Sequence, residues 1–176
     1  MMRRLLFVAY LYPPVGGAGV QRSAKFVKYL PDCGWLPSVL TVANPSVPLI
    51  DTSLALDTPE EVILRRARTL EPSYALKSVV SAGSANGNGH SRSLRRFARH
   101  TAHTAVKLLL QPDPQVLWLP AAIREGRKLL REIPHDAILV SAPPFSSFFV
   151  GVALSRWSGL PLVLDYRDEW DLSNAY

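Results

Sequence analysis

The chain has 176 residues, of which 48% are hydrophobic and 19% are charged, which fits one folded domain and excludes a disordered chain. Its single cysteine, Cys33, excludes an internal disulfide and fits a reducing cytosol, and no apolar run is long enough to span a bilayer. The net charge of +6 is uneven, because residues 1–110 carry 14 Lys and Arg against 6 Asp and Glu, whereas residues 111–176 carry 6 against 8, so we expect an anionic partner on one surface only.

The first predicted element is a buried strand over residues 5–10, which are continuously apolar. A glycine-rich loop follows, and apolar residues at helical spacing then predict a helix over residues 20–30. Gly16, Gly17 and Gly19 permit a positive φ and close approach of a ligand to the backbone. The start of the helix would offer free N–H groups to a phosphate. The same loop could be a tight strand-to-helix turn without a ligand.

The next segments continue the alternation. Gly34 stands where a helix C-terminal cap is expected, and residues 37–42 and 61–66 predict the second and third strands. Residues 71–80 predict a short helix. The low-complexity residues 81–91 predict a mobile loop inside a single domain that spans residues 1–176.

A basic amphipathic helix is predicted over residues 93–110. Its basic stripe consists of Arg92, Arg96, Arg99, His103 and Lys107. The stripe could contact an anionic membrane, which would place a cytoplasmic protein at the inner face of that membrane. A solvated face of a domain helix explains the pattern equally well. His100 and His103 have no further ligand near them, so we expect no metal, and the absence of a recognised motif argues against nucleic acid.

The C-terminal part completes an α/β pattern. It predicts helices over residues 120–132 and 145–157, the latter ended by Gly159, and strands over residues 136–141 and 162–165. Strands separated by helices predict a Rossmann-like parallel sheet with helices on both faces. Ligands bind such sheets at the carboxyl ends of the strands.

Three unusual loops fall at that edge, namely residues 16–19, 143–147 and 167–170, and we expect them to build one site. Pro144 suits the start of a helix, and Ser146 or Ser147 could either cap that helix or contact a ligand.

Charged residues follow the last strand. Alternation places Asp165 and Arg167 on one side of the chain and Tyr166 and Asp168 on the other. The charged groups could form an ion pair that only fixes the loop. A carboxylate here could instead orient a sugar hydroxyl or act as a base, and Asp168 is the candidate.

The glycine-rich loop departs from the dinucleotide fingerprint. Arg22 stands where the third glycine is required, and the second strand ends at Asn44 without the acidic residue that would hold a ribose. A nucleotide-dependent oxidoreductase is therefore disfavoured.

As an ordered set, these segments resemble the N-terminal domain of family 4 glycosyltransferases, retaining enzymes with the two-domain GT-B fold. The matching residues are 12–22, 25–30, 34–35, 39–42, 112–115, 118–120, 141–147 and 165–170.

The resemblance implies a Rossmann-like N-terminal half of a GT-B fold in a hexosyltransferase-type enzyme. It implies that a sugar or lipid-linked acceptor binds this domain, with no cofactor. The nucleotide-sugar donor would be a co-substrate bound mainly by a C-terminal domain that these residues lack, so we expect a truncated, excised or split chain with little activity alone. Many relatives carry a histidine where Arg167 or Asp168 stands here, and that histidine's role is not transferred.

The resulting hypothesis is an acceptor-binding domain in cell-surface polysaccharide or glycolipid synthesis. The alternative is a non-catalytic module that binds phosphate or lipid headgroups. Asp168 is the candidate catalytic residue, and the candidate substrate-binding or phosphate-binding residues are Gly16, Gly17, Gly19, Arg22, Pro144, Ser146 and Arg167.

Overall fold

The structure is a computed structural model that describes residues 2–47, 49–53, 58–71 and 111–167. The predicted loop over residues 81–91 and the predicted basic helix over residues 93–110 lie outside the described residues, as does the predicted helix over residues 71–80 apart from its first residue.

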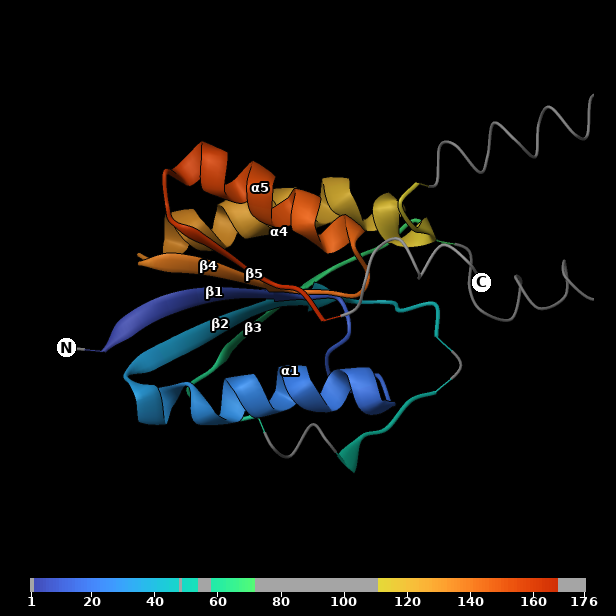
Figure 1. Ribbon diagram of the computed structural model, residues 1–176, viewed down its shortest axis with the longest axis horizontal. Helices are drawn as coiled ribbons and strands as arrows, with labels where there is room; N and C mark the ends of the chain where they lie inside the picture. The colour runs from blue at the N-terminus through green and yellow to red at the C-terminus, as the bar shows by residue number, and fades with distance from the viewer. Residues whose placement is uncertain (1, 48, 54–57, 72–110, 168–176) are drawn as a thin grey trace, which may run out of the picture.

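The centre of the fold is a parallel sheet of five strands in the order β3-β2-β1-β4-β5 (Figure 1). The strands are β1 (Arg3–Ala9), β2 (Trp35–Val42), β3 (Ile63–Ala67), β4 (Ala137–Ser141) and β5 (Leu162–Asp165). The chain runs outward from β1 to β3 on one side and then returns to place β4 on the other side of β1. The predicted Rossmann-like α/β fold is therefore confirmed, with its topological switch point between β1 and β4.

Helices cover both faces of the sheet. Helix α1 (Ala18–Tyr29) lies on one face, and α4 (Leu119–Glu132) and α5 (Ser146–Ser158) lie together on the other (Figure 1). Two short 3₁₀ helices, η1 (Pro31–Cys33) and η3 (Pro114–Trp118), precede β2 and α4. Among the described residues, no helix combines the length and apolar character needed to cross a bilayer.

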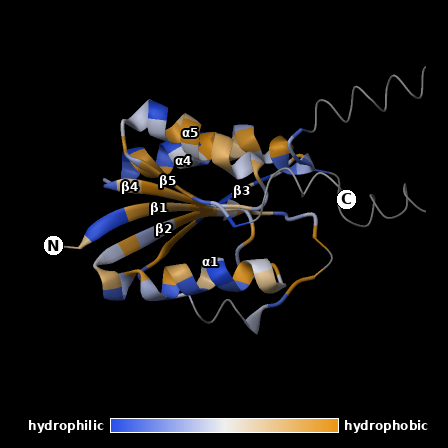
Figure 2. Cartoon of the chain, in the orientation of Figure 1, coloured by the Kyte–Doolittle hydropathy of each residue, from blue (hydrophilic) through white to orange (hydrophobic). Residues whose placement is uncertain are grey.

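Strand β1 is buried on both sides because its alternate residues enter two different cores. Leu6 and Val8 pack with residues of α4 and α5, whereas Phe7 and Ala9 pack with residues of α1 and β2. This position explains why β1 is a continuous apolar run after Arg4, coloured as hydrophobic in Figure 2.

The structure corrects one predicted cap and adds a turn. Gly34 has a φ of 81° but ends η1 rather than α1, because the chain makes a further 3₁₀ turn after Leu30. Gly159 ends α5 with a φ of 76°, as predicted. The first two strands each begin two residues before the predicted bounds, because Arg3 pairs with Trp35. Arg3 is exposed and Trp35 is half-buried, so neither belongs to the apolar run from which the strands were predicted.

Candidate functional site

The loops after β1 and β4 and the residues after β5 meet at one edge of the sheet. Arg167 Nη1 donates a hydrogen bond to the carbonyl oxygen of Gly19 at 3.0 Å. On the other side of the sheet, the Tyr166 ring lies 5.7 Å from the Phe145 ring and 5.4 Å from the Phe148 ring. The three predicted loops, as far as Arg167, therefore lie together.

Asp165 is the charged centre of this edge. Its carboxylate accepts hydrogen bonds from Arg22 Nε at 2.9 Å, from an Arg22 Nη at 2.6 Å and from Ser141 Oγ at 2.9 Å. Burial raises the pKa of Asp165, but the bonds from Arg22 and Ser141 and the charges of Arg22 and Arg167 outweigh it, so the pKa lies below its ordinary value. The ion pair thus joins β5 to α1, and the guanidinium of Arg22 is engaged by protein.

Two glycines of the loop before α1 are required by the fold itself. Gly17 has a φ of 106° at the start of α1, a conformation that other residues rarely adopt. A Cβ atom on Gly16 would lie 2.6 Å from Cγ of Leu49, so a side chain here would require Leu49 to move. No described side chain caps α1 and its first turn has no acidic residue, so the positive end of this helix is not neutralised locally.

The start of α5 is held by Asp113 and not by a serine of its own. Asp113 Oδ2 accepts a hydrogen bond from the Ser146 N–H at 2.8 Å, and the N-cap residue is Phe145. Ser146 and Ser147 therefore do not cap the helix, which was one of the two interpretations left open by the sequence. Both serine hydroxyls and Asp113 Oδ1 are buried without a hydrogen-bond partner among the described residues.

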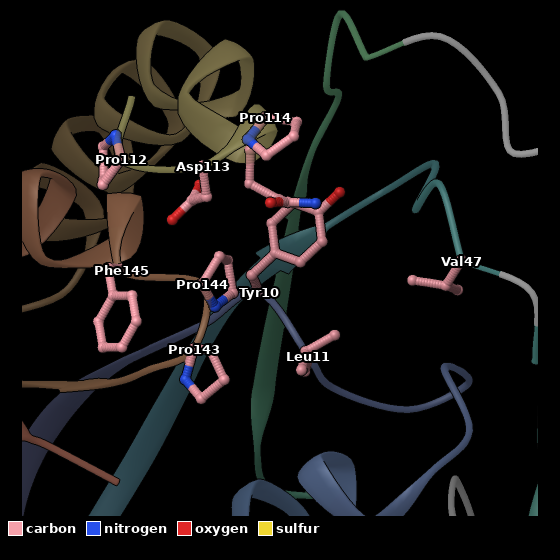
Figure 3. A pocket seen from close by; sticks show the side chains of 10 residues that line it. Tyr10, Leu11, Val47, Pro112, Asp113, Pro114, Pro143, Pro144 and Phe145 are labelled. Atoms are coloured by element: carbon pink, nitrogen blue, oxygen red, sulfur yellow. The ribbon is translucent and has the colours of Figure 1, made fainter. Parts of the chain in front are cut away.

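A pocket of about 420 Å³ lies at the carboxyl ends of β1 and β4 (Figure 3). It is lined by three segments of the chain and one residue of a fourth, namely Tyr10 and Leu11, Pro112 to Gln115, Pro143 to Phe145, and Val47. In Figure 3 the carboxylate of Asp113 lies above Pro144 and Phe145, and Leu11 and Val47 lie across from them. The pocket is at the switch point where ligands of open α/β sheets bind.

Tyr10 forms a fixed wall of the pocket. Its ring meets the ring of Trp118 edge to face, with the centroids 5.3 Å apart, and its hydroxyl donates to Glu71 Oε1 at 3.1 Å. Trp118 is fully buried and its indole N–H donates to the Ala67 carbonyl at 3.1 Å. Burial is the main cause that raises the pKa of Tyr10, and the charges of Glu71 and Asp113 raise it further.

The chemistry of the pocket follows from this lining. Proline rings, aromatic rings and aliphatic side chains provide apolar walls, and Asp113 and Gln115 provide polar groups. Within the described ranges, no group of three His, Cys, Asp or Glu side chains is arranged to hold a metal ion.

Solved structures with this fold include a glycosyltransferase. UGT2 of Phytolacca americana, complexed with UDP-2fluoro-glucose and pterostilbene, matches 93% of this chain and 30% of its own with a TM-score of 0.52 and 15% identity. The α/β fold of this chain is therefore similar to that of the matched part of UGT2. At this identity the likeness shows the fold alone, and it supports a GT-B-like fold without distinguishing family 4.

Two further structures resemble the chain more weakly. Apo UGT2 of the same plant matches 92% of this chain and 29% of its own, with a TM-score of 0.48 and 15% identity. The C-terminal domain of PF1911 hydrogenase from Pyrococcus furiosus matches 94% of this chain and 91% of its own, with a TM-score of 0.45 and 15% identity. Both TM-scores are below 0.5, so these two likenesses support no conclusion about this chain. No protein-family model matches the sequence, and no curated protein matches it.

The predicted site residues fall into two groups around the pocket. Pro144 lines it and Ser146 lies directly behind it, whereas the predicted glycines and arginines lie at the neighbouring start of α1. Their roles in binding stay predictions. Asp168 lies outside the described residues, and so do Arg92, Arg96, Arg99 and Lys107 of the predicted basic stripe and the histidine pair His100 and His103.

Sequence reasoning assigned a site role to one of the described lining residues, Pro144. Asp113 belonged to residues 112–115, which carry the family resemblance, but it was given no role, and Tyr10 was predicted as the end of a buried strand. The available signal was the position of Asp113 inside a segment that already carried the resemblance.

Proposed function

We propose that this chain is the acceptor-binding N-terminal domain of a retaining, nucleotide-sugar-dependent glycosyltransferase of the family 4 type, acting in cell-surface polysaccharide or glycolipid synthesis. One observation carries the proposal. Residues 112–115 and 143–145, which belong to the motifs that carry the family resemblance, are separated by α4 and β4 and yet line the same pocket at the switch point. The fold shared with UGT2 supports it.

The proposed division of labour places the acceptor in the pocket. In glycosyl transfer the acceptor hydroxyl oxygen bonds to the anomeric carbon of the donor, and the bond from that carbon to the diphosphate oxygen breaks. The hydroxyl proton passes to a carboxylate base or to the oxygen of the leaving diphosphate. Negative charge develops on the leaving diphosphate and requires hydrogen-bond donors to stabilise it. The free N–H groups at the N-terminus of α1, beside Arg167, are the described groups best placed to supply these hydrogen bonds. Asp168 remains the proposed base or orienting carboxylate.

The chain spans 30% of the length of UGT2, so we propose that a second, donor-binding domain completes the cleft. The test is sugar transfer from a panel of labelled UDP- and GDP-sugars to lipid and polysaccharide acceptors, with a family 4 donor domain supplied in trans. Transfer that requires both polypeptides supports the proposal. Binding of inorganic phosphate or phospholipid vesicles without transfer from any donor would support the non-catalytic alternative instead.

A further inference from the structure

The pocket offers hydrogen-bond acceptors and few donors. Four of its ten lining residues are prolines, which have no backbone N–H; they are Pro112, Pro114, Pro143 and Pro144. None of these ten described residues is Lys or Arg. Phosphate is held in proteins by N–H groups and cationic side chains, so the described part of the lining offers few of the groups that a phosphate requires.

Among the described residues, two carboxylates line or adjoin the pocket. Asp113 is a lining residue, its Oδ2 is bonded to the Ser146 N–H, and its Oδ1 has no partner among the described residues. Glu71 lies behind the pocket wall, hydrogen-bonded to the Tyr10 hydroxyl. A carboxylate in a partly buried, apolar setting repels a second anion far more strongly than it would in water.

Among the described residues, three arginines reach the loop before α1 or the end of β5, and each is engaged by protein. Arg22 is bonded to Asp165, Arg66 donates to the Pro13 carbonyl, and Arg167 donates to the Gly19 carbonyl at the start of α1. None of the three lines the pocket. The edge is thereby divided into a neutral-to-acidic pocket and a separate, electropositive helix start.

We propose, on the basis of the proposed function, that the pocket takes a neutral, hydroxyl-bearing part of the acceptor with one apolar face, excludes phosphate, and owes this selectivity to Asp113. The proline and aromatic walls contact the apolar face. A hydroxyl of the ligand donates to Oδ2 of Asp113, because Oδ1 is buried, and this is a charge-assisted hydrogen bond. Any phosphate of an acceptor or donor lies outside the pocket, toward α1.

A pair of matched probes tests this inference on the full 176-residue chain. p-Nitrophenyl β-glucoside is neutral and hydroxylated, whereas p-nitrophenyl phosphate carries the same ring and an anionic group. Binding is followed by NMR through the backbone amides of Leu11, Gln115 and Phe145, which line the pocket. We expect the glucoside to shift these amides saturably and the phosphate to leave them unchanged.

The decisive variant is Asp113→Asn, which keeps an oxygen for the Ser146 N–H and removes the charge. We expect affinity for the glucoside to fall about tenfold and pocket binding of the phosphate to rise at least about tenfold. Asp32→Asn makes the same charge change at exposed η1, at the opposite edge of the sheet, and should alter neither. Val47→Trp, which narrows the pocket from the side opposite α5, should abolish glucoside binding even if Asp113→Asn fails to fold.

Equal or tighter pocket binding of the phosphate by the unaltered chain would overturn the inference. So would the absence of saturable glucoside binding, or an unchanged preference in Asp113→Asn. The test distinguishes this inference from the proposed function. Selective glucoside binding without sugar transfer would support the inference and contradict the proposed function. Sugar transfer that is insensitive to Asp113 would support the proposed function and contradict the inference.

Discussion

Replacing Asp165 by alanine removes the contact that joins β5, β4 and α1. The Arg22 side chain is 50% exposed, and solvent therefore screens its ion pair with Asp165, which contributes about 0.5–1 kcal/mol to stability. Ser141 is only 3% exposed, and loss of the acceptor for its hydroxyl costs about 1–2 kcal/mol. Asp165→Ala should therefore lower the free energy of unfolding by about 1.5–3 kcal/mol, and Arg22→Ala by about 1 kcal/mol or less.

The stabilisation by Asp165 should depend on pH. Because the pKa of Asp165 in the folded chain lies below its ordinary value, its contribution is complete above the unfolded-state pKa and is lost as the pH falls through the lowered folded-state pKa. Urea denaturation at about pH 7 and about pH 3 measures the difference between Asp165→Ala and the unaltered chain. The difference should shrink at the lower pH, and the double variant Arg22→Ala/Asp165→Ala should be little less stable than Asp165→Ala. A difference that is equal at both pH values, or fully additive effects, would refute the reasoning.

Three further predictions concern the core and the pocket wall. Gly151→Ala should lower the free energy of unfolding by at least about 1–3 kcal/mol in chemical denaturation, because the added Cβ would lie 2.3 Å from Cγ2 of Val140; an unchanged midpoint contradicts this. Trp118→Phe should cost about 1–3 kcal/mol, because it removes one of the two donors to the Ala67 carbonyl, which keeps the Ala43 N–H, and leaves a space where the larger, fully buried indole was; a loss below about 0.5 kcal/mol would contradict this. The raised pKa of Tyr10 means that its contribution to stability is complete below about pH 10 and is lost as the pH rises through the folded-state pKa. Tyr10→Phe should therefore unfold less steeply in alkali than the unaltered chain, and thermal denaturation between about pH 8 and pH 11 measures the slope.

The sequence predicted the layers of the fold because buried parallel strands leave a clear apolar signal. The run after Arg4 was predicted as a buried strand, and the helix between Gly17 and Leu30 had the right spacing to cover one of its faces. Alternation after β5 was equally informative, since Asp165 and Arg167 do turn toward α1 while Tyr166 turns toward α5.

The composition of the pocket was beyond the sequence because it depends on pairs that are distant in the chain. Asp113 reaches Ser146 across 33 residues, and Arg22 reaches Asp165 across 143. The sequence pattern showed whether each position is apolar or charged, but it did not show which charged side chains form hydrogen bonds or ion pairs with each other. The sequence therefore placed the phosphate-binding and acceptor-binding roles on one set of residues, whereas the structure separates the start of α1 from the pocket.

The acceptor dependence of sugar transfer tests the central claim most directly. Phe145 lines the pocket, whereas Phe149 lies on the same helix with its side chain 46% exposed and outside the pocket lining, so alanine at each position makes a matched pair. With the donor domain present, Phe145→Ala should raise the acceptor KM at least about tenfold with little change in the donor KM, and Phe149→Ala should leave both unchanged. Equal acceptor KM values for a folded Phe145→Ala variant and the unaltered chain would contradict the placement of the acceptor in this pocket.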